Sequence, residues 1–196
     1  MTRPILIMFL VLLLIAAGLG YYAYHLKKRV ALEEQQMAEK SQVVTPPAGG
    51  PTTLVTLYVA SDADGGLRRA QENVALPTER SERARAVLRT LFGKYSQGSS
   101  PHPIGAGSDV RDVFLMSGNT AIVDTSAAFA DKHPSGVLVE ELTIGSIVNT
   151  LNANDPQITR VKILVDGKER DTLAGHADLQ RFYSAGSIAP EGKGTP

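Results

Sequence analysis

Two kinds of hydrophobic pattern divide the chain. Ile5 to Tyr24 is an unbroken apolar run without a charged side chain. As an α-helix this run spans ~30 Å, the thickness of the hydrocarbon core of a bilayer. Tyr21, Tyr22 and Tyr24 lie together at one end, where aromatic rings suit the membrane interface. Bulky residues throughout and the lack of a small-residue cleavage site argue against a cleaved signal peptide. The pattern predicts a transmembrane anchor over residues 1–26.

The charges beside this run bear on its orientation. Lys27 to Arg29 follow it, whereas Arg3 and the amino terminus precede it. By the positive-inside rule this excess places the C-terminal part of the chain in the cytoplasm. The excess is small, however, and two glutamates follow at Glu33 and Glu34. The flanking charges therefore leave both orientations open.

A change of composition marks the domain boundaries. Residues 27–53 begin with polar helix formers, which predict a juxtamembrane helix, and end in a Pro- and Gly-rich linker. Residues 54–183 alternate apolar and polar positions and predict one globular domain. Residues 184–196 return to glycine, proline and small polar residues, which predict a disordered tail.

The first half of the domain predicts two strands and a helix. Leu54 to Ala60 is rich in β-branched and aromatic residues and predicts a strand. Leu67 to Leu76 predicts a second strand, although its charges also suit a helix. A helix is expected after Pro77, with Thr78 as its N-cap. Its apolar face at helical spacing consists of Ala84, Val87, Leu88, Leu91, Phe92 and Tyr95.

The second half adds strands and another helix. Val110 to Met116 and Thr120 to Thr125 flank Ser117-Gly118-Asn119, which predicts a hairpin. Val137 to Asn152 has helical periodicity, and Ile158 to Val165 predicts a strand. Asp166-Gly167 is typical of a type I′ turn and leads to an expected short strand over Lys168 to Arg170. The expected fold class is α+β: a mixed β-sheet of five or six strands with two helices packed on one face, preceded by a single transmembrane helix.

Composition excludes several function classes. The 20 basic and 20 acidic residues give zero formal net charge, so no broad basic face for nucleic acid is expected. The chain has no cysteine, which excludes disulfides, thiolate metal sites, a cysteine nucleophile and lipid attachment through a lipobox. Neither a P-loop, a dinucleotide-binding fingerprint nor a hydrolase elbow occurs. No cofactor and no metal is predicted.

Six segments follow one another in a characteristic order: Val55 to Val59, Ser100 to Gly105, Ala121 to Phe129, Ile147 to Leu151, Val161 to Lys168 and Gly175 to Leu179. Pro77 before the first helix fits the same pattern. Through these segments most of residues 54–179 resembles the GerMN domain of bacterial spore-germination and sporulation proteins. Two positions depart from the family pattern: Thr125 replaces a leucine-like residue, and Asn152 to Pro156 replaces a Thr-x-Phe-Pro segment at the exit of the second helix.

The resemblance implies an extracytoplasmic α/β domain that associates with other proteins or with cell-wall material, without known catalytic activity. It also favours an anchor with its amino end inside, against the flanking charges. Many family members are lipoproteins, whereas this chain has an apolar run and no cysteine.

Five residues are candidates for binding, and each also has a structural interpretation. Asp124 ends an apolar strand, where a carboxylate commonly caps backbone amides. His176 and Asp178 are too few for a zinc site and are expected to hydrogen-bond to the backbone. His102 lies between two prolines, either lining a binding surface or held in a rigid turn. Glu140 is expected in solvent or at the helix N-terminus.

The predicted function is therefore that of a non-catalytic protein of the bacterial inner membrane, single-pass, with its C-terminal domain outside the cytoplasm. Its expected partners are envelope proteins or peptidoglycan, and sheet edges leave room for self-association. No nucleic acid is expected. Two alternatives remain: a cell-wall-acting enzyme with Asp124 and a loop histidine in its site, or a cytoplasm-facing adaptor.

Overall fold

The computed structural model describes residues 52–186. The predicted transmembrane anchor and residues 27–51 of the predicted juxtamembrane helix and linker lie outside this range, as do residues 187–196 of the predicted tail. Within residues 52–186, no helix is long and apolar enough to cross a membrane. Mixed α and β structure, as expected for an α+β fold, is confirmed in this part of the chain.

Six strands form two sheets, which corrects the expectation of a single sheet. A two-stranded antiparallel hairpin stands apart from a four-stranded sheet of order β3-β4-β5-β6. In the larger sheet β4 and β5 run parallel, and the other neighbours are antiparallel. The strands are β1 (Thr53–Ser61), β2 (Gly66–Val74), β3 (Val110–Met116), β4 (Thr120–Thr125), β5 (Arg160–Val165) and β6 (Tyr183–Ser184).

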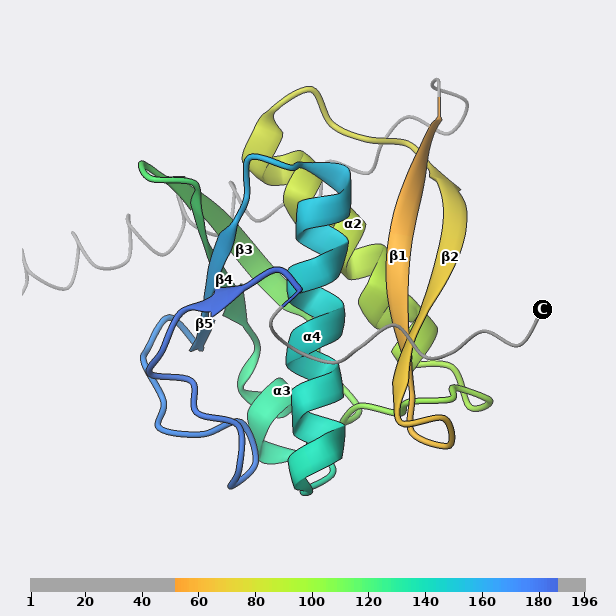
Figure 1. Cartoon of the computed structure of the whole chain (residues 1–196), viewed down its shortest axis with the longest axis vertical. Coiled ribbons are helices and arrows are strands. Elements are labelled where there is room, and N and C mark those ends of the chain that lie inside the picture. Colours follow the sequence, from red (N-terminus) through yellow and green to blue (C-terminus); the bar gives the residue numbers. More distant parts are fainter. Residues whose placement is uncertain (1–51, 187–196) are drawn as a thin grey trace, which may run out of the picture. The chain divides into compact units, whose positions relative to one another are not determined.

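The two long helices lie between the two sheets rather than on one outer face. They are α2 (Arg80–Tyr95) and α4 (Val137–Asn154), and the short α3 (Ala127–Asp131) follows β4. Figure 1 shows α4 between the β1–β2 hairpin and the four-stranded sheet, with α2 behind it. Because α4 has neighbours on both sides, it is buried around most of its circumference from Glu140 to Leu151.

The edge of β1 that faces α4 is covered by side chains instead of another strand. The Thr56 N–H donates to Asn154 Oδ1 (3.0 Å) and the Tyr58 N–H to Thr150 Oγ1 (2.9 Å). Asn154 Nδ2 returns a hydrogen bond to the Thr56 carbonyl (2.7 Å). Thr150 and Asn154 are four residues apart and therefore share one face of α4. Two helix turns thus satisfy the backbone of an edge strand.

A third amide on the same edge is satisfied from α2. The Ala60 N–H donates to the hydroxyl oxygen of Tyr95 at 2.9 Å. Tyr95 belongs to the predicted apolar face of α2, whose six residues are all buried. Burial raises the pKa of Tyr95 to about 12, so the phenol stays neutral.

The N-cap of α2 is Glu79, not Thr78 as expected. The helix begins at Arg80, and the Glu79 carboxylate accepts hydrogen bonds from the N–H groups of Ser81 (3.0 Å) and Glu82 (2.7 Å). The hydrogen bond from the Ser81 hydroxyl and those from the backbone N–H groups lower the pKa of Glu79 to about 2, and burial opposes this lowering only weakly. The longer carboxylate side chain thus performs the capping role expected of threonine.

Both predicted tight turns are present, but the strand expected after the second is not. Gly118 and Asn119 have φ of 77° and 59°, and Asp166 and Gly167 have φ of 56° and 73°, as a type I′ turn requires. After Gly167 a single bridge joins Val165 to Lys168. The partner of β5 is instead β6, which includes the first residue of the predicted tail.

Two segments of the domain are too short or too irregular for a hydrophobic periodicity to predict them. Apart from a bridge between Thr172 and Asp178, the segment from Asp171 to Leu179 has no regular secondary structure. It nevertheless buries Leu173, Ala177 and Leu179. The short helix α3 was not expected either. It places Phe129 in the core, where its ring stacks on Phe92 with centroids 5.4 Å apart.

Replacing Thr150 by valine tests the side-chain cover of β1. Thr150→Val keeps the shape but leaves the Tyr58 N–H without its acceptor, which costs about 1–3 kcal/mol for a buried donor. We expect a lower urea midpoint by circular dichroism and faster hydrogen exchange at the Tyr58 amide. Thr90→Val is the matched control, because the Thr90 hydroxyl bonds to Ala86 O of its own helix. Equal midpoints for the two variants would contradict the proposed cover.

Candidate functional site

Glu140 holds the segment around His176 against α4. Its side chain is fully buried. Oε2 accepts hydrogen bonds from the N–H groups of Ala174 (3.0 Å), His176 (2.9 Å) and Ala177 (2.8 Å). Oε1 accepts from the Gly136 N–H (3.2 Å) and lies 2.9 Å from His176 Nδ1. Of the two expected positions, solvent is therefore wrong, whereas the helix N-terminus is confirmed: Glu140 lies in the first turn of α4, and its carboxylate also anchors a loop.

This arrangement determines the ionisation of Glu140. Burial alone raises the pKa of a carboxyl group, because it disfavours the charged form. Here the hydrogen bonds from the Ala177 N–H, the His176 ring and the N–H groups of Ala174 and His176 outweigh burial and lower the pKa of Glu140 to about 2. The carboxylate is thus charged at neutral pH.

His176 and Asp178 both line a small polar cavity of about 230 Å³ with Glu141, Arg181 and Tyr183. His176 is the more exposed partner of Glu140, with 43% of its side chain accessible. The Asp178 carboxylate accepts the Gln180 N–H at 2.8 Å, as expected for a backbone contact. His176 differs from expectation, because its ring contacts the Glu140 side chain. The structure thus brings together three of the predicted residues: Glu140, His176 and Asp178.

His102 is fully buried, which is against the first of its two interpretations, that it lines a binding surface. Its Nδ1 lies 2.5 Å from Asp62 Oδ1 and its Nε2 lies 2.6 Å from Thr143 Oγ1. The same hydroxyl lies 2.7 Å from His133 Nε2, and His133 Nδ1 lies 2.7 Å from the Pro134 carbonyl. Sequence reasoning did not single out His133 or Thr143, since they come from different segments.

The Pro134 carbonyl can only accept, so His133 Nδ1 donates to it. The Thr143 hydroxyl also lies 3.1 Å from the Val139 carbonyl of its own helix, to which it donates. Burial lowers the pKa of His133, and the neighbouring His102 lowers it further, which favours the neutral form of His133. The network links the β1–β2 turn, the 96–108 loop and α4.

Asp124 lies at the end of β4, next to the turn that follows β5. Its Oδ1 accepts the Gly167 N–H at 2.7 Å, and its Oδ2 lies 3.5 Å from Arg111 Nε. This is the backbone-capping role expected for a carboxylate at a strand end. No histidine within residues 52–186 contacts Asp124, although the enzyme alternative requires such a pair. In the same range, no group of three potential ligands could hold a metal ion.

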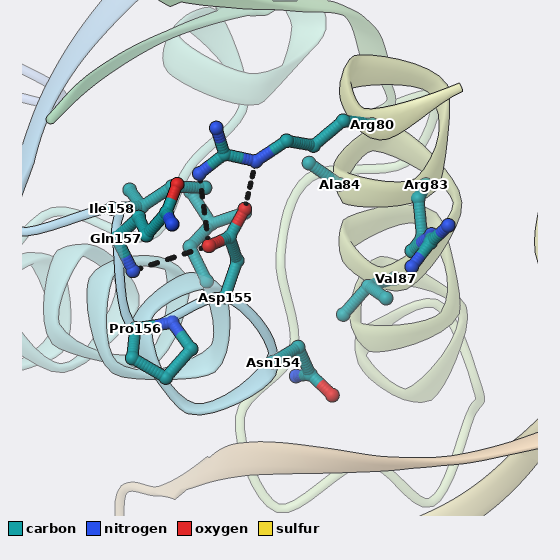
Figure 2. A pocket seen from close by; sticks show the side chains of 10 residues that line it. Arg80, Arg83, Ala84, Val87, Asn154, Asp155, Pro156, Gln157 and Ile158 are labelled. Carbon is teal, nitrogen blue, oxygen red and sulfur yellow. Dashed lines mark hydrogen bonds and ion pairs between the residues drawn. The ribbon is translucent and has the colours of Figure 1, made fainter. Parts of the chain in front are cut away.

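A further cleft was not predicted. It has a volume of about 460 Å³ and lies between α2 and the end of α4 (Figure 2). Four of its residues are on one face of α2: Arg80, Arg83, Ala84 and Val87. Their helical spacing is visible in the sequence, but Ala84 and Val87 belong to the predicted apolar face, and the sequence does not distinguish residues that line a cleft from the rest of that face. The departure from the family pattern at Asn152 to Pro156 was the available signal, because Asn154 to Ile158 form the other side.

Comparison with known proteins identifies the family. The model of the Germane family, described as sporulation and spore germination, matches residues 56–171. The chain belongs to this family, which confirms the resemblance drawn from the sequence. No curated protein matches the chain.

Three solved structures are similar to the chain. A Clostridium perfringens protein described as a lipoprotein shares 18% identity over 70% of this chain and 91% of that one, with a TM-score of 0.49. The first GerMN domain of the sporulation protein GerM from Bacillus subtilis shares 20% sequence identity. The match covers 65% of this chain and 93% of that one, with a TM-score of 0.47. The tandem GerMN domains of the same protein share 21% sequence identity. The match covers 68% of this chain and 46% of that one, with a TM-score of 0.48.

The Glu140 anchor predicts a pH-dependent stability. A pKa lowered from 4.5 to about 2 corresponds to about 3 kcal/mol, which is present above pH ~4.5 and is lost as the pH falls towards ~2. Glu140→Gln should therefore lower the free energy of unfolding by a similar amount at neutral pH. The difference from the unmodified chain should shrink by more than half near pH ~3.

Urea unfolding at the two pH values, followed by circular dichroism, measures this difference. Glu141→Gln is the control: its side chain is exposed on the next position of α4, so a change within about 0.5 kcal/mol is expected. A loss that is the same at both pH values would show that the charge of Glu140 is not the cause.

Proposed function

We propose that this chain is a non-catalytic, single-pass protein of the bacterial inner membrane, whose Germane-type domain binds other envelope proteins outside the cytoplasm. Membership of the family supports the type of domain. The apolar run Ile5 to Tyr24 supports the anchor, and the linker of residues 27–53 supplies its reach.

The outer face of the four-stranded sheet is the observation that carries the proposal. Successive residues of a strand point to opposite faces, and Val113, Val123 and Ile163 point into the core. The alternate positions face away from the helices. The strand register gives two rows on this outer face: Phe114, Ile122 and Lys162, and Met116, Thr120 and Arg160.

Large apolar side chains on this face are exposed. Phe114 is 48% and Met116 is 54% accessible, although a solvated sheet face normally carries polar residues. Phe182 is also exposed, and the Arg160 guanidinium lies 4.5 Å from its ring centroid. Such a patch is typical of a protein interaction site. The exposed cation of Arg160 favours a partner with an apolar surface and acidic residues at its rim.

Photocrosslinking in the native host tests this surface. With p-benzoylphenylalanine in place of Phe114, we expect an adduct with an envelope protein, identified by mass spectrometry. Gln71, exposed on β2, is the control position and should give none. A second substitution, Met116→Lys, should reduce the Phe114 adduct at least several-fold, because it places a charge in the apolar contact. Equal labelling at Phe114 and Gln71, or adducts with peptidoglycan alone, would contradict a protein-binding face.

A topology reporter tests the side of the membrane. With alkaline phosphatase fused after Pro196, we expect activity, since that enzyme requires the oxidising space outside the cytoplasm. A reporter that is fluorescent only in the cytoplasm, fused at the same position, should give no fluorescence. The opposite result would favour the adaptor alternative and the flanking charges Lys27 to Arg29.

A further inference from the structure

The cleft between α2 and the end of α4 has an apolar floor and a polar rim. Ala84, Val87, Leu151 and Ile158 supply apolar surface, and each is buried against the core. Arg80, Arg83, Asn154, Asp155 and Gln157 supply the polar groups. Its volume of about 460 Å³ lies in the range of small-ligand sites. This composition suits a ligand with one apolar group and a polar end.

Most polar groups of the rim are already engaged. Arg80 makes a two-pronged contact with Asp155, through Nε to Oδ2 (2.5 Å) and Nη2 to Oδ1 (2.9 Å), drawn in Figure 2. Asp155 Oδ1 also accepts the Gln157 N–H at 3.1 Å. The hydrogen bonds from Arg80 lower the pKa of Asp155, and the nearby charge of Arg83 lowers it further, so this carboxylate stays charged. Its hydrogen-bonded ion pair is with Arg80. The Asn154 amide is committed to Thr56 on β1.

Arg83 is the cation that the rim leaves unneutralised. It donates from Nη2 to the Thr78 carbonyl at 3.2 Å, and no carboxylate in residues 52–186 forms an ion pair with it. The charges of the lining, two arginines and one aspartate, therefore sum to one positive charge. One carboxylate matches that charge, whereas a phosphate dianion exceeds it. The exposed Gln157 side chain adds a donor and an acceptor suited to a peptide group.

We propose that this cleft binds the C-terminal end of a peptide, with its carboxylate at Arg83 and an aliphatic side chain on the floor. This site is separate from the outer face of the four-stranded sheet and does not depend on that surface. The terminal carboxylate belongs either to a partner protein or to a wall peptide ending in a D-residue. Both sources share the same recognition chemistry.

Calorimetric titration of the full chain with short peptides tests the proposal. Acetyl-Gly-Ala-Leu with a free carboxylate should bind with a dissociation constant of about 1 mM or lower, and its C-terminal amide at least about tenfold more weakly. Arg83→Gln should weaken binding of the acid about tenfold and leave binding of the amide unchanged. Arg68→Gln, on an exposed arginine of β2, is the matched control and should change neither.

A second variant addresses the floor. Ala84→Leu adds bulk inside the cleft and should abolish binding of both peptides, with circular dichroism showing an unchanged fold. Acetyl-Gly-D-Ala-D-Ala, as acid and amide, distinguishes the sources. Stronger binding of the L-acid supports a protein terminus, and stronger binding of the D-acid supports a wall peptide. Equal binding of acids and amides, full binding by Arg83→Gln, or no binding of either acid would overturn the proposal.

Discussion

The contact between α4 and the free edge of β1 is the constraint on which the fold depends. A strand edge presents N–H and C=O groups that must be satisfied when they are buried. Here Thr150 and Asn154 satisfy two residues of β1 from one helix face, and Tyr95 of α2 satisfies a third. Each such bond contributes about 1 kcal/mol net, but leaving its donor unmet costs more. The hairpin is therefore held beside α4 in one register.

The opposite end of α4 positions the C-terminal segment. Glu140 gathers four backbone N–H groups and one imidazole, and Thr143 joins two buried histidines one turn further along. Polar residues on a central helix normally destabilise a core unless every group finds a partner. In this domain those partners come from the β1–β2 turn, the 96–108 loop and residues 174–177. One helix thus connects elements that are distant in the sequence.

Much of the local structure was predictable from particular residues. The six apolar positions of α2, the hairpin at Gly118 and Asn119 and the Asp166-Gly167 turn depend on neighbours along the chain, and all are present. The candidate site was predicted less well. Glu140, His176 and Asp178 were named individually, but their grouping follows from a loop that folds back on α4. The cleft went unrecognised, because Arg80 and Asp155 are 75 residues apart and meet only across two helix ends.

The sequence alone determined the family, the order of α2, α4 and strands β1 to β5, and the apolar run before the domain. These depend on motif, spacing and hydrophobicity. Only the tertiary structure decided that the strands form two sheets with helices between them. The alternation of apolar residues tells which face of a strand is buried, but not which edge meets another strand. The edge of β1 does not pair with another strand because side chains such as Asn154 satisfy its backbone groups instead.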